Sequence, residues 1–438
     1  MPPMHGAVRW APMTRFKCAL ALLAIVLAAR ALAADKPNIV FILADDVADQ
    51  ALGCYGGTSY QTPRLDALAQ AGIRFRHCYS MPVCHPSRIA IMTGRYPYRM
   101  GRPQWGTFPR NLESASIGVA MRRLGYATAI AGKWQLTLLR DEPDHPKRLG
   151  FDRWSLFGWH EGPRYYRPLI YQDGRVRSDV NDRYGPDVYV EQLVDFMRDN
   201  RDKPFFAFYS MALAHDVTDD VGTPPPLGPQ GHYDSYKKMV ENMDERVGRL
   251  VDAVEELGIR ERTLFLFTAD NGTPKSYYFT AAGGKMFKQP IKLVWNGQTV
   301  EGGKGELTDG GTRVPLVANW PGKLAPGQVV DDLVDFSDWF PTFVDLAGGT
   351  VPDGLDGVSL ADRLRGGAAS PRPWAFASGS AGRWVRTQRW KLYDDGRLYD
   401  MSAGREEVAP LTISRASEEA LRARAELEAA LRGLSPPD

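Results

Sequence analysis

Residues 38–44 read NIVFILA, an unbroken apolar run that ends at Asp45 and Asp46. A strand whose two faces are both covered by helices in a parallel sheet has this pattern. Similar apolar runs recur at 127–131, 205–213, 264–268 and 314–317. Helical patterns lie between them, at 63–70, 113–124, 188–200 and 235–257. Strands that alternate with helices predict an α/β fold with a central, mostly parallel sheet and helices on both faces.

Three stretches between these elements show no clear period and are predicted to be long loops, at 140–187, 216–231 and 273–303. Loops of that length in a compact domain are usually functional. From about residue 350 the pattern changes to short strand-like pieces at 374–378, 382–393 and 397–401, followed by a helical pattern at 418–432. We therefore predict a main domain at 35–350 and a small C-terminal subdomain at 351–438, with an antiparallel sheet and a helix.

The N-terminus has the features of a secretory signal peptide at 1–34. Arg9, Arg15 and Lys17 precede an apolar run at 18–29, and Ala31, Ala33 and Ala34 supply a small-residue cleavage site. The apolar run is too short to cross a bilayer, so no membrane anchor is predicted. We expect an exported protein, periplasmic or secreted.

Composition limits the partners and the redox chemistry. The 438 residues carry a formal net charge of +2 with no basic block, which gives no reason to expect nucleic acid as a partner. Cleavage of the signal peptide leaves Cys54, Cys78 and Cys84. An odd count in an exported protein marks one thiol for a role other than pairing. Cys54 and Cys78 could form a disulfide or remain free.

The thiol with the most informative surroundings is Cys84, which opens the run Cys84-His85-Pro86-Ser87-Arg88. The pattern predicts that Cys84 starts a short helix. A helix N-terminus and a guanidinium such as that of Arg88 both stabilise an anion, so the thiol could act as a nucleophile.

Polar residues follow the predicted strands, at the edge where open α/β sheets bind ligands. Asp45 and Asp46 follow the first strand, and Asp270 and Asn271 follow the strand at 264–268. Oxygen ligands of this kind suit a hard cation such as Ca²⁺ or Mg²⁺. Three further residues are placed to meet an anion or to transfer a proton: Lys133, His215 and Lys304.

The motif C-x-P-S-R-x4-T-G at Cys84–Gly94 resembles the signature of type I sulfatases. Further matches follow in the family's order over about residues 37 to 322, at Asp45-Asp46, Gly132-Lys133-Trp134, His215, Asp270-Asn271-Gly272, Lys304 and Asp309–Pro315. The resemblance implies an alkaline-phosphatase-like fold, a catalytic domain at 35–350 and the hydrolysis of a sulfuric ester.

The resemblance also implies roles for individual residues. A maturation enzyme would oxidise Cys84 to formylglycine, whose hydrated aldehyde is the nucleophile. One Ca²⁺, with Mg²⁺ as the alternative, would be held by Asp45, Asp46, Asp270, Asn271 and an oxygen of the modified Cys84. Arg88 would orient the hydrate, and Lys133 and Lys304 would hold the sulfate. His215 would bind the sulfate or protonate the leaving alcohol.

The chain departs from the family pattern at two positions. Gln135 stands where the family usually has a histidine that assists collapse of the intermediate, and glutamine cannot accept a proton at ordinary pH. His85 is one candidate to replace that base. Asp309 stands where glutamate is common, in a segment that we expect to be structural.

The residues leave room for further functions. A two-zinc phosphatase needs several histidine ligands, and only His232 lies beyond His215 in this chain, which argues against that function. Three other functions stay open: a formylglycine-dependent phosphonate or phosphate monoester hydrolase, a weakly active homologue that binds sulfated glycans, and a binding protein with an ordinary thiol.

A sulfated carbohydrate is the preferred substrate because aromatic side chains, which stack on sugar rings, occur in the predicted loops. These are Trp105, Trp159, His160, Tyr165 and Tyr166, together with Arg164. The same side chains could instead pack the loops onto the domain.

Overall fold

The computed structural model describes residues 36–216, 235–280 and 286–434. The predicted signal peptide at 1–34 lies outside the described residues, and so does most of the predicted loop at 216–231. Within the described residues no helix combines the length and the apolar character needed to cross a membrane.

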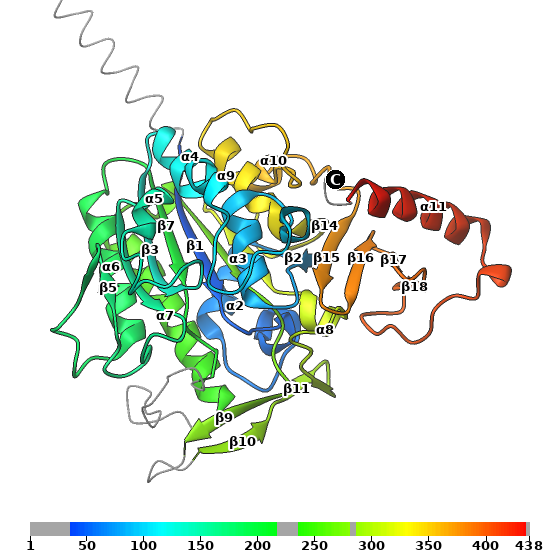
Figure 1. Cartoon of the computed structure of the whole chain (residues 1–438), viewed down its shortest axis with the longest axis horizontal. Coiled ribbons are helices and arrows are strands. Elements are labelled where there is room, and N and C mark those ends of the chain that lie inside the picture. Colours follow the sequence, from blue (N-terminus) through cyan, green and yellow to red (C-terminus); the bar gives the residue numbers. More distant parts are fainter. Residues whose placement is uncertain (1–35, 217–234, 281–285, 435–438) are drawn as a thin grey trace, which may run out of the picture.

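A large central sheet organises the main body of the molecule (Figure 1). Its ten strands follow the order β14-β2-β13-β8-β1-β7-β3-β4-β5-β6. The five consecutive strands from β8 to β4 all run parallel to their neighbours, and β14 runs parallel to β2. The strands are β1 (Asn38–Ala44), β2 (Ile73–Tyr79), β3 (Ala127–Trp134), β4 (Arg153–Gly158), β5 (Tyr171–Gln172), β6 (Arg175–Val176), β7 (Phe205–Ser210), β8 (Thr263–Ala269), β13 (Leu316–Asn319) and β14 (Gln328–Asp335). The predicted mostly parallel sheet is confirmed.

Two layers of helices sandwich this sheet. On one side α6 (Gly185–Asp199) packs against α7 (Tyr236–Glu256), and α7 packs against α2 (Pro63–Gln70). On the other side α3 (Cys84–Thr93) and α4 (Ile117–Arg123) pack against α9 (Trp339–Leu346). The three shortest helices are α5 (His145–Arg148), α8 (Asp309–Thr312) and α10 (Ala361–Leu364). Every residue of β1 is buried, as its continuous apolar sequence requires.

The register of the central strands brings their carboxyl ends to one edge. Ala44 of β1 pairs with Ala269 of β8, and Ser210 of β7 pairs with both Leu43 and Gly132. The polar residues that follow each strand therefore start at the same level. This alignment places the predicted site residues together.

Several predicted boundaries were wrong. The stretch 140–187 is not all loop, because it contributes β4, β5 and β6 to the sheet. The stretch 273–303 forms two hairpins, β9 (Ser276–Thr280) with β10 (Met286–Pro290), and β11 (Lys292–Trp295) with β12 (Gln298–Glu301). The strand predicted at 205–213 ends earlier, at Ser210. Strand β13 is antiparallel to both of its neighbours, β2 and β8. These strands were missed because most are short and their polar residues break any apolar period.

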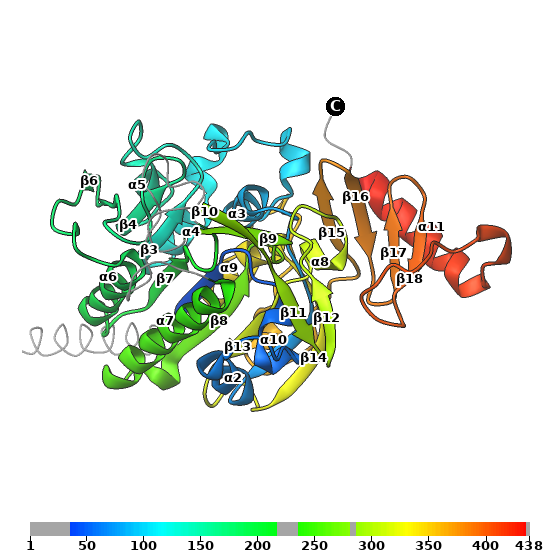
Figure 2. The same cartoon turned by 90° about the horizontal axis from the view of Figure 1, so that it is seen from below.

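A second, smaller sheet lies to one side of the main body together with the last helix (Figures 1 and 2). It is fully antiparallel, with strands β15 (Ala375–Gly379), β16 (Gly382–Arg386), β17 (Trp390–Tyr393) and β18 (Leu398–Asp400). Helix α11 (Glu418–Gly433) packs against β16 and β17 and buries Leu427 with Trp384 and Leu392 in a separate cluster. The C-terminal sheet and helix are as predicted, and the boundary near residue 350 remains a prediction.

Candidate active site

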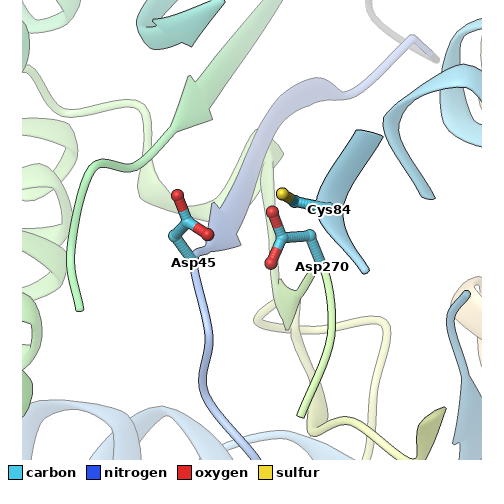
Figure 3. Close-up of side chains that lie close together, drawn as sticks. All are labelled: Asp45, Cys84 and Asp270. Carbon is cyan, nitrogen blue, oxygen red and sulfur yellow. The ribbon is translucent and has the colours of Figure 1, made fainter. Parts of the chain in front are cut away.

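Cys84 is the first residue of α3 and is 2% exposed. Val83 before it is extended, Pro86 fits the first helical turn, and Gly94 ends the helix in the left-handed conformation. The sulfur lies beside two carboxylates, and Figure 3 shows Cys84 and Asp270 facing each other with Asp45 close by. One ligand atom from each of these three residues lies within 4.8 Å of the other two.

The environment of Cys84 does not favour a thiolate. Burial raises the pKa of the thiol, and the negative charges of Asp270 and Asp45 add to the increase, although Lys133 and Lys304 oppose it. A reactive cysteine needs a lowered pKa. The thiol is therefore poorly suited to act as the nucleophile itself.

The carboxylates of Asp45 and Asp270 repel each other in the protein interior. Burial and the charge of Asp45 raise the pKa of Asp270 to about 6, even though Arg88 donates to its Oδ2 from Nε at 3.1 Å and from Nη2 at 2.6 Å. Burial alone would also raise the pKa of Asp45, but Lys133 and the other nearby cations hold it well below its usual range. A bound cation would relieve this repulsion.

Asp46 has a backbone φ of 65°, in the left-handed region that few residues other than glycine adopt. Its amide donates to Asp270 Oδ1 at 3.2 Å, which fixes the turn. Its carboxylate accepts from Asn271 Nδ2 at 2.6 Å and from the hydroxyl of Tyr277 at 2.5 Å. Strain of this kind costs about 1–3 kcal/mol and is found mainly at functional sites.

Two buried oxygen atoms at this position have no hydrogen-bond partner among the described residues: Asp45 Oδ1 and Asn271 Oδ1. A buried acceptor left unpaired costs about 1–3 kcal/mol. Carboxylate and amide oxygens are the ligands that Ca²⁺ and Mg²⁺ prefer. The four carboxylate and amide residues among the predicted metal ligands are completely buried, so the residues present fit a hard divalent cation.

Three basic side chains balance the three carboxylates. Lys133 Nζ donates to Asp45 Oδ2 at 2.6 Å, Lys304 Nζ donates to Asp46 Oδ2 at 2.7 Å, and Arg88 binds Asp270. With these residues charged, the formal sum of the six is zero. A divalent cation would make the cluster positive and favourable for an anion.

His215 follows β7 and reaches the same cluster. Its Nε2 lies 3.3 Å from Lys304 Nζ and 3.7 Å from Asp46 Oδ2, while Nδ1 lies 3.0 Å from the carbonyl oxygen of Asp216. The structure thus brings the predicted site residues together at the carboxyl edge of the sheet. Gln135 differs from the others because it makes no hydrogen bond to the cluster. Gln135 is 1% exposed, and both of its amide atoms lack a partner among the described residues.

Sequence reasoning missed Tyr277, Ser87 and Ser210. Ser87 Oγ donates to the Asp270 carbonyl at 2.6 Å, and Ser210 Oγ donates to the Lys133 carbonyl at 2.7 Å while accepting from Arg88. Ser87 lies inside the motif that starts at Cys84, so that motif could have identified it. Tyr277 belongs to β9, in a stretch predicted to be loop, and no local signal distinguishes it.

The residues predicted to border the site divide into three groups. Tyr165 and Arg164 are buried, and the one hydroxyl proton of Tyr165 is shared between the carbonyls of Ala212 and His215, each 2.7 Å away, so both residues are structural. Tyr166 is half-buried and pairs with Tyr184 in an isolated β-bridge. Trp105, Trp159 and His160 form a row of neighbouring rings that starts at His85, the residue after Cys84; the His85–Trp105 pair is stacked and the other two pairs are tilted. Successive ring centroids lie 5.6 Å (His85–Trp105), 5.2 Å (Trp105–Trp159) and 3.9 Å (Trp159–His160) apart.

His85 is poorly suited to replace the missing base. Its Nε2 bonds the Thr107 carbonyl at 2.9 Å, and burial lowers its pKa to about 4. Cys54 and Cys78 are both free, and neither contacts the cluster.

A model of the family described as Sulfatase matches residues 37–349. The chain belongs to the sulfatase family. It is therefore an enzyme that hydrolyses sulfate esters. This sulfatase is 32% identical to mouse steryl-sulfatase over 80% of its length and 70% of the relative's. It is 32% identical to human arylsulfatase A over 81% of its length and 73% of the relative's.

Solved structures agree with the fold of this sulfatase. The crystal structure of Ps i-CgsB matches with a TM-score of 0.72 and 24% identity, over 91% of this chain and 93% of that one. BT4656 in complex with its substrate D-glucosamine-2-N,6-O-disulfate matches with a TM-score of 0.68 and 22% identity, over 91% and 98%. A phosphonate monoester hydrolase from Silicibacter pomeroyi also shares the fold, with a TM-score of 0.62 and 19% identity over 91% and 95%.

Proposed function

We propose that the protein is an exported sulfatase that removes sulfate from a carbohydrate ester with a formylglycine made from Cys84 and one Ca²⁺. The observation that carries the proposal is the cluster of Cys84, Asp45 and Asp270 with the neighbouring Asn271, in which the buried atoms Asp45 Oδ1 and Asn271 Oδ1 have no partner among the described residues. A partner enzyme that generates formylglycine would act on Cys84 before the chain folds around it, since the thiol is buried.

The chain's residues divide the work at this site. Asp45, Asp46, Asp270 and Asn271 would hold Ca²⁺, or Mg²⁺ in its place, and the metal would polarise oxygen atoms bound to it. Formylglycine at position 84 would supply an oxygen nucleophile, which suits a site of oxygen ligands better than sulfur does. Arg88, fixed by Asp270 and Ser210, would orient that group and stabilise its negative charge.

The lysines and His215 would act on the sulfate ester. Lys133 is buried and Lys304 is partly buried, both form ion pairs with the cluster, and both would bind the sulfate oxygens. His215 has Nδ1 directed at the Asp216 carbonyl, so that nitrogen carries the proton in the neutral ring and Nε2 faces Lys304 and Asp46. The protonated ring would donate from Nε2 to the leaving alcohol oxygen.

The aromatic row beside Cys84 supports a carbohydrate substrate. Trp105 is 45% exposed; its ring contacts that of Trp159, which in turn contacts that of His160. Burial lowers the pKa of His160 at the end of this row, and the positive charges of Arg164, His215 and Lys133 add to the decrease. Exposed indole faces stack on sugar rings, and a row of them would hold the ring that carries the ester.

Two measurements test the proposal. The protein is co-expressed with a maturation enzyme, and mass spectrometry is applied to the peptide that contains Cys84, with the peptides of Cys54 and Cys78 as internal controls. We expect formylglycine at Cys84 alone, and an active protein with only unmodified thiol at 84 would disprove the mechanism. A screen of sulfated sugars beside aryl sulfates and phosphate or phosphonate esters then identifies the substrate class.

A further inference from the structure

A cavity of about 270 Å³ lies outside the candidate active site, between the main sheet and the segment that follows β18. Four of its lining residues are arginines, and none is acidic: Tyr55, Gly56, Arg74, Arg76, Trp295, Asn296, Arg313 and Arg405. No residue of the candidate active site lines it. Its volume is close to the lower end of the range of about 300–1,000 Å³ for small-molecule pockets.

Acidic neighbours neutralise only part of this charge. Arg405 binds both carboxylate oxygens of Asp49, and Arg76 lies 2.9 Å from Asp331. Arg74 has no ion pair among the residues that the structure describes. The cavity therefore has an excess of positive charge.

Arg313 contributes to this excess. Its guanidinium lies 3.9 Å from Asp49 and 3.5 Å from Asp309, but Arg405 already occupies the first carboxylate and Arg386 the second. The side chain of Arg313 is only 12% exposed, and its Nε has no hydrogen-bond partner in the described part of the chain. A buried donor without a partner indicates that a ligand or water completes the site.

Aromatic rings hold two of the guanidinium groups in place. Arg74 lies over the ring of Tyr55 at 5.4 Å, and Arg405 lies over the ring of Trp295 at 5.0 Å. Trp295 Nε1 donates to the Tyr55 carbonyl at 2.7 Å, and the Tyr55 hydroxyl donates to the Leu316 carbonyl at 2.8 Å. The two rings are thus fixed to each other and to β13. Such pre-organisation reduces the entropy that a ligand must overcome.

We propose that this cavity binds a tetrahedral oxyanion, sulfate or phosphate, either free or as an ester group on a larger molecule. Planar guanidinium groups match the oxygen atoms of such anions and bind them with charge-assisted hydrogen bonds. Arg405 belongs to the C-terminal segment, whereas Arg74 and Arg313 belong to the main body, so the anion joins the two. The inference does not depend on the reaction proposed for Cys84.

Titration calorimetry with sodium sulfate and with sodium phosphate, each against sodium chloride at equal ionic strength, tests the site. Arg74→Gln removes a cavity charge that has no ion pair to lose, and Arg122→Gln on the exposed face of α4 is the control with the same change of charge. We expect Arg74→Gln to weaken binding at this site about tenfold and Arg122→Gln to leave it unchanged. Arg76→Gln is a second cavity variant, and thermal unfolding verifies that each variant is folded.

Diffraction from crystals soaked in selenate separates this site from the catalytic one. We expect anomalous selenium density between Arg74 and Arg405 that disappears in Arg74→Gln, while turnover of the matured enzyme stays at the wild-type rate. Density at the candidate active site only, equal affinity in both variants, or binding only at crystal concentrations (an adventitious ion only) would each overturn the proposal. A sulfated disaccharide and its unsulfated form distinguish a bound ester group from a free ion.

Discussion

Lys133 donates a hydrogen bond of 2.6 Å from Nζ to Asp45 Oδ2, and both side chains are almost completely buried. A predicted sulfate-binding residue is therefore attached to a predicted metal ligand. Removing one member of a buried pair leaves the other charge without compensation, which costs about 3–5 kcal/mol. The lysine consequently supports the acidic cluster as well as the binding of an anion.

The first prediction concerns this pair. We expect Lys133→Ala to lower kcat/KM at least about 100-fold, because the site loses a cation that stabilises developing negative charge. Steady-state kinetics on the best sulfate ester from the screen provide the measurement. Lys147→Ala, which removes an exposed lysine, is the control and should keep wild-type activity. Equal activity in both variants would show that Lys133 has no role in turnover.

Tyr277 donates to Asp46 Oδ2 at 2.5 Å and is completely buried beside His215. Since partners that orient a metal ligand typically contribute about 10–100-fold to metal affinity, Tyr277→Phe should weaken Ca²⁺ binding by that factor. Calorimetric titration of the metal-free protein measures the change. Tyr278→Phe, at the exposed neighbouring position, is the matched control. If both variants bind Ca²⁺ like the wild type, Tyr277 does not position the carboxylate.

Metal removal tests the oxygen ligand set as a whole. We expect a chelator to abolish turnover and to lower the melting temperature, because a ligand that binds only the folded state stabilises it. Ca²⁺ or Mg²⁺ should restore both properties. Recovery with Zn²⁺ alone would contradict a hard-cation site.

Gln135 occupies the position where a histidine base is expected. Its buried amide lacks partners among the described residues, and a narrow cavity beside it is also lined by Arg88, Lys133 and Ser210. We expect Gln135→His to retain turnover and to add a limb near pH 6.5 to the pH–rate profile, since histidine titrates there. Gln135→Leu separates the polar role of the amide from its packing. Complete loss of activity in Gln135→His would show that the amide itself is essential.

Asp309 provides the pH prediction for stability. Arg386 donates to both of its oxygens, at 2.8 and 3.1 Å. Burial alone would raise the pKa of Asp309, but Arg386 together with Lys391 and Arg313 lowers it from 3.8 to about 2. A carboxyl group with a lowered folded pKa stabilises the protein fully above its unfolded value. That contribution, about 2 kcal/mol, is lost as the pH falls from about 4 to 2.

We therefore expect Asp309→Asn to lose stability at neutral pH and to show a flatter pH dependence below pH 4. Chemical denaturation at a series of pH values gives the free energy of unfolding for both proteins. Asp331→Asn, at a half-exposed ion pair, should change the stability little. A wild-type curve that is flat between pH 4 and 2 would refute the assignment.

The local sequence determined the order of the main strands and helices along the chain and the start of α3 at Cys84. These features depend on apolar runs and on residues such as Pro86 and Gly94, whose effects act within a few positions. The candidate ligands Asp45, Asp46, Asp270 and Asn271 were also recognisable, because parallel strands bring their carboxyl ends to one edge.

Only the tertiary structure decided which distant residues meet. The partners of Asp46 and Asp309, Tyr277 and Arg386, lie 231 and 77 positions away in the sequence, and no local period relates them. The cavity of Arg74, Arg313 and Arg405 likewise assembles three separate segments. The sequence by itself determined the candidate nucleophile and the edge of the sheet at which it lies. The burial and charge pairing of these side chains depend on the packed chain, so only the fold decided the environment that sets their chemistry.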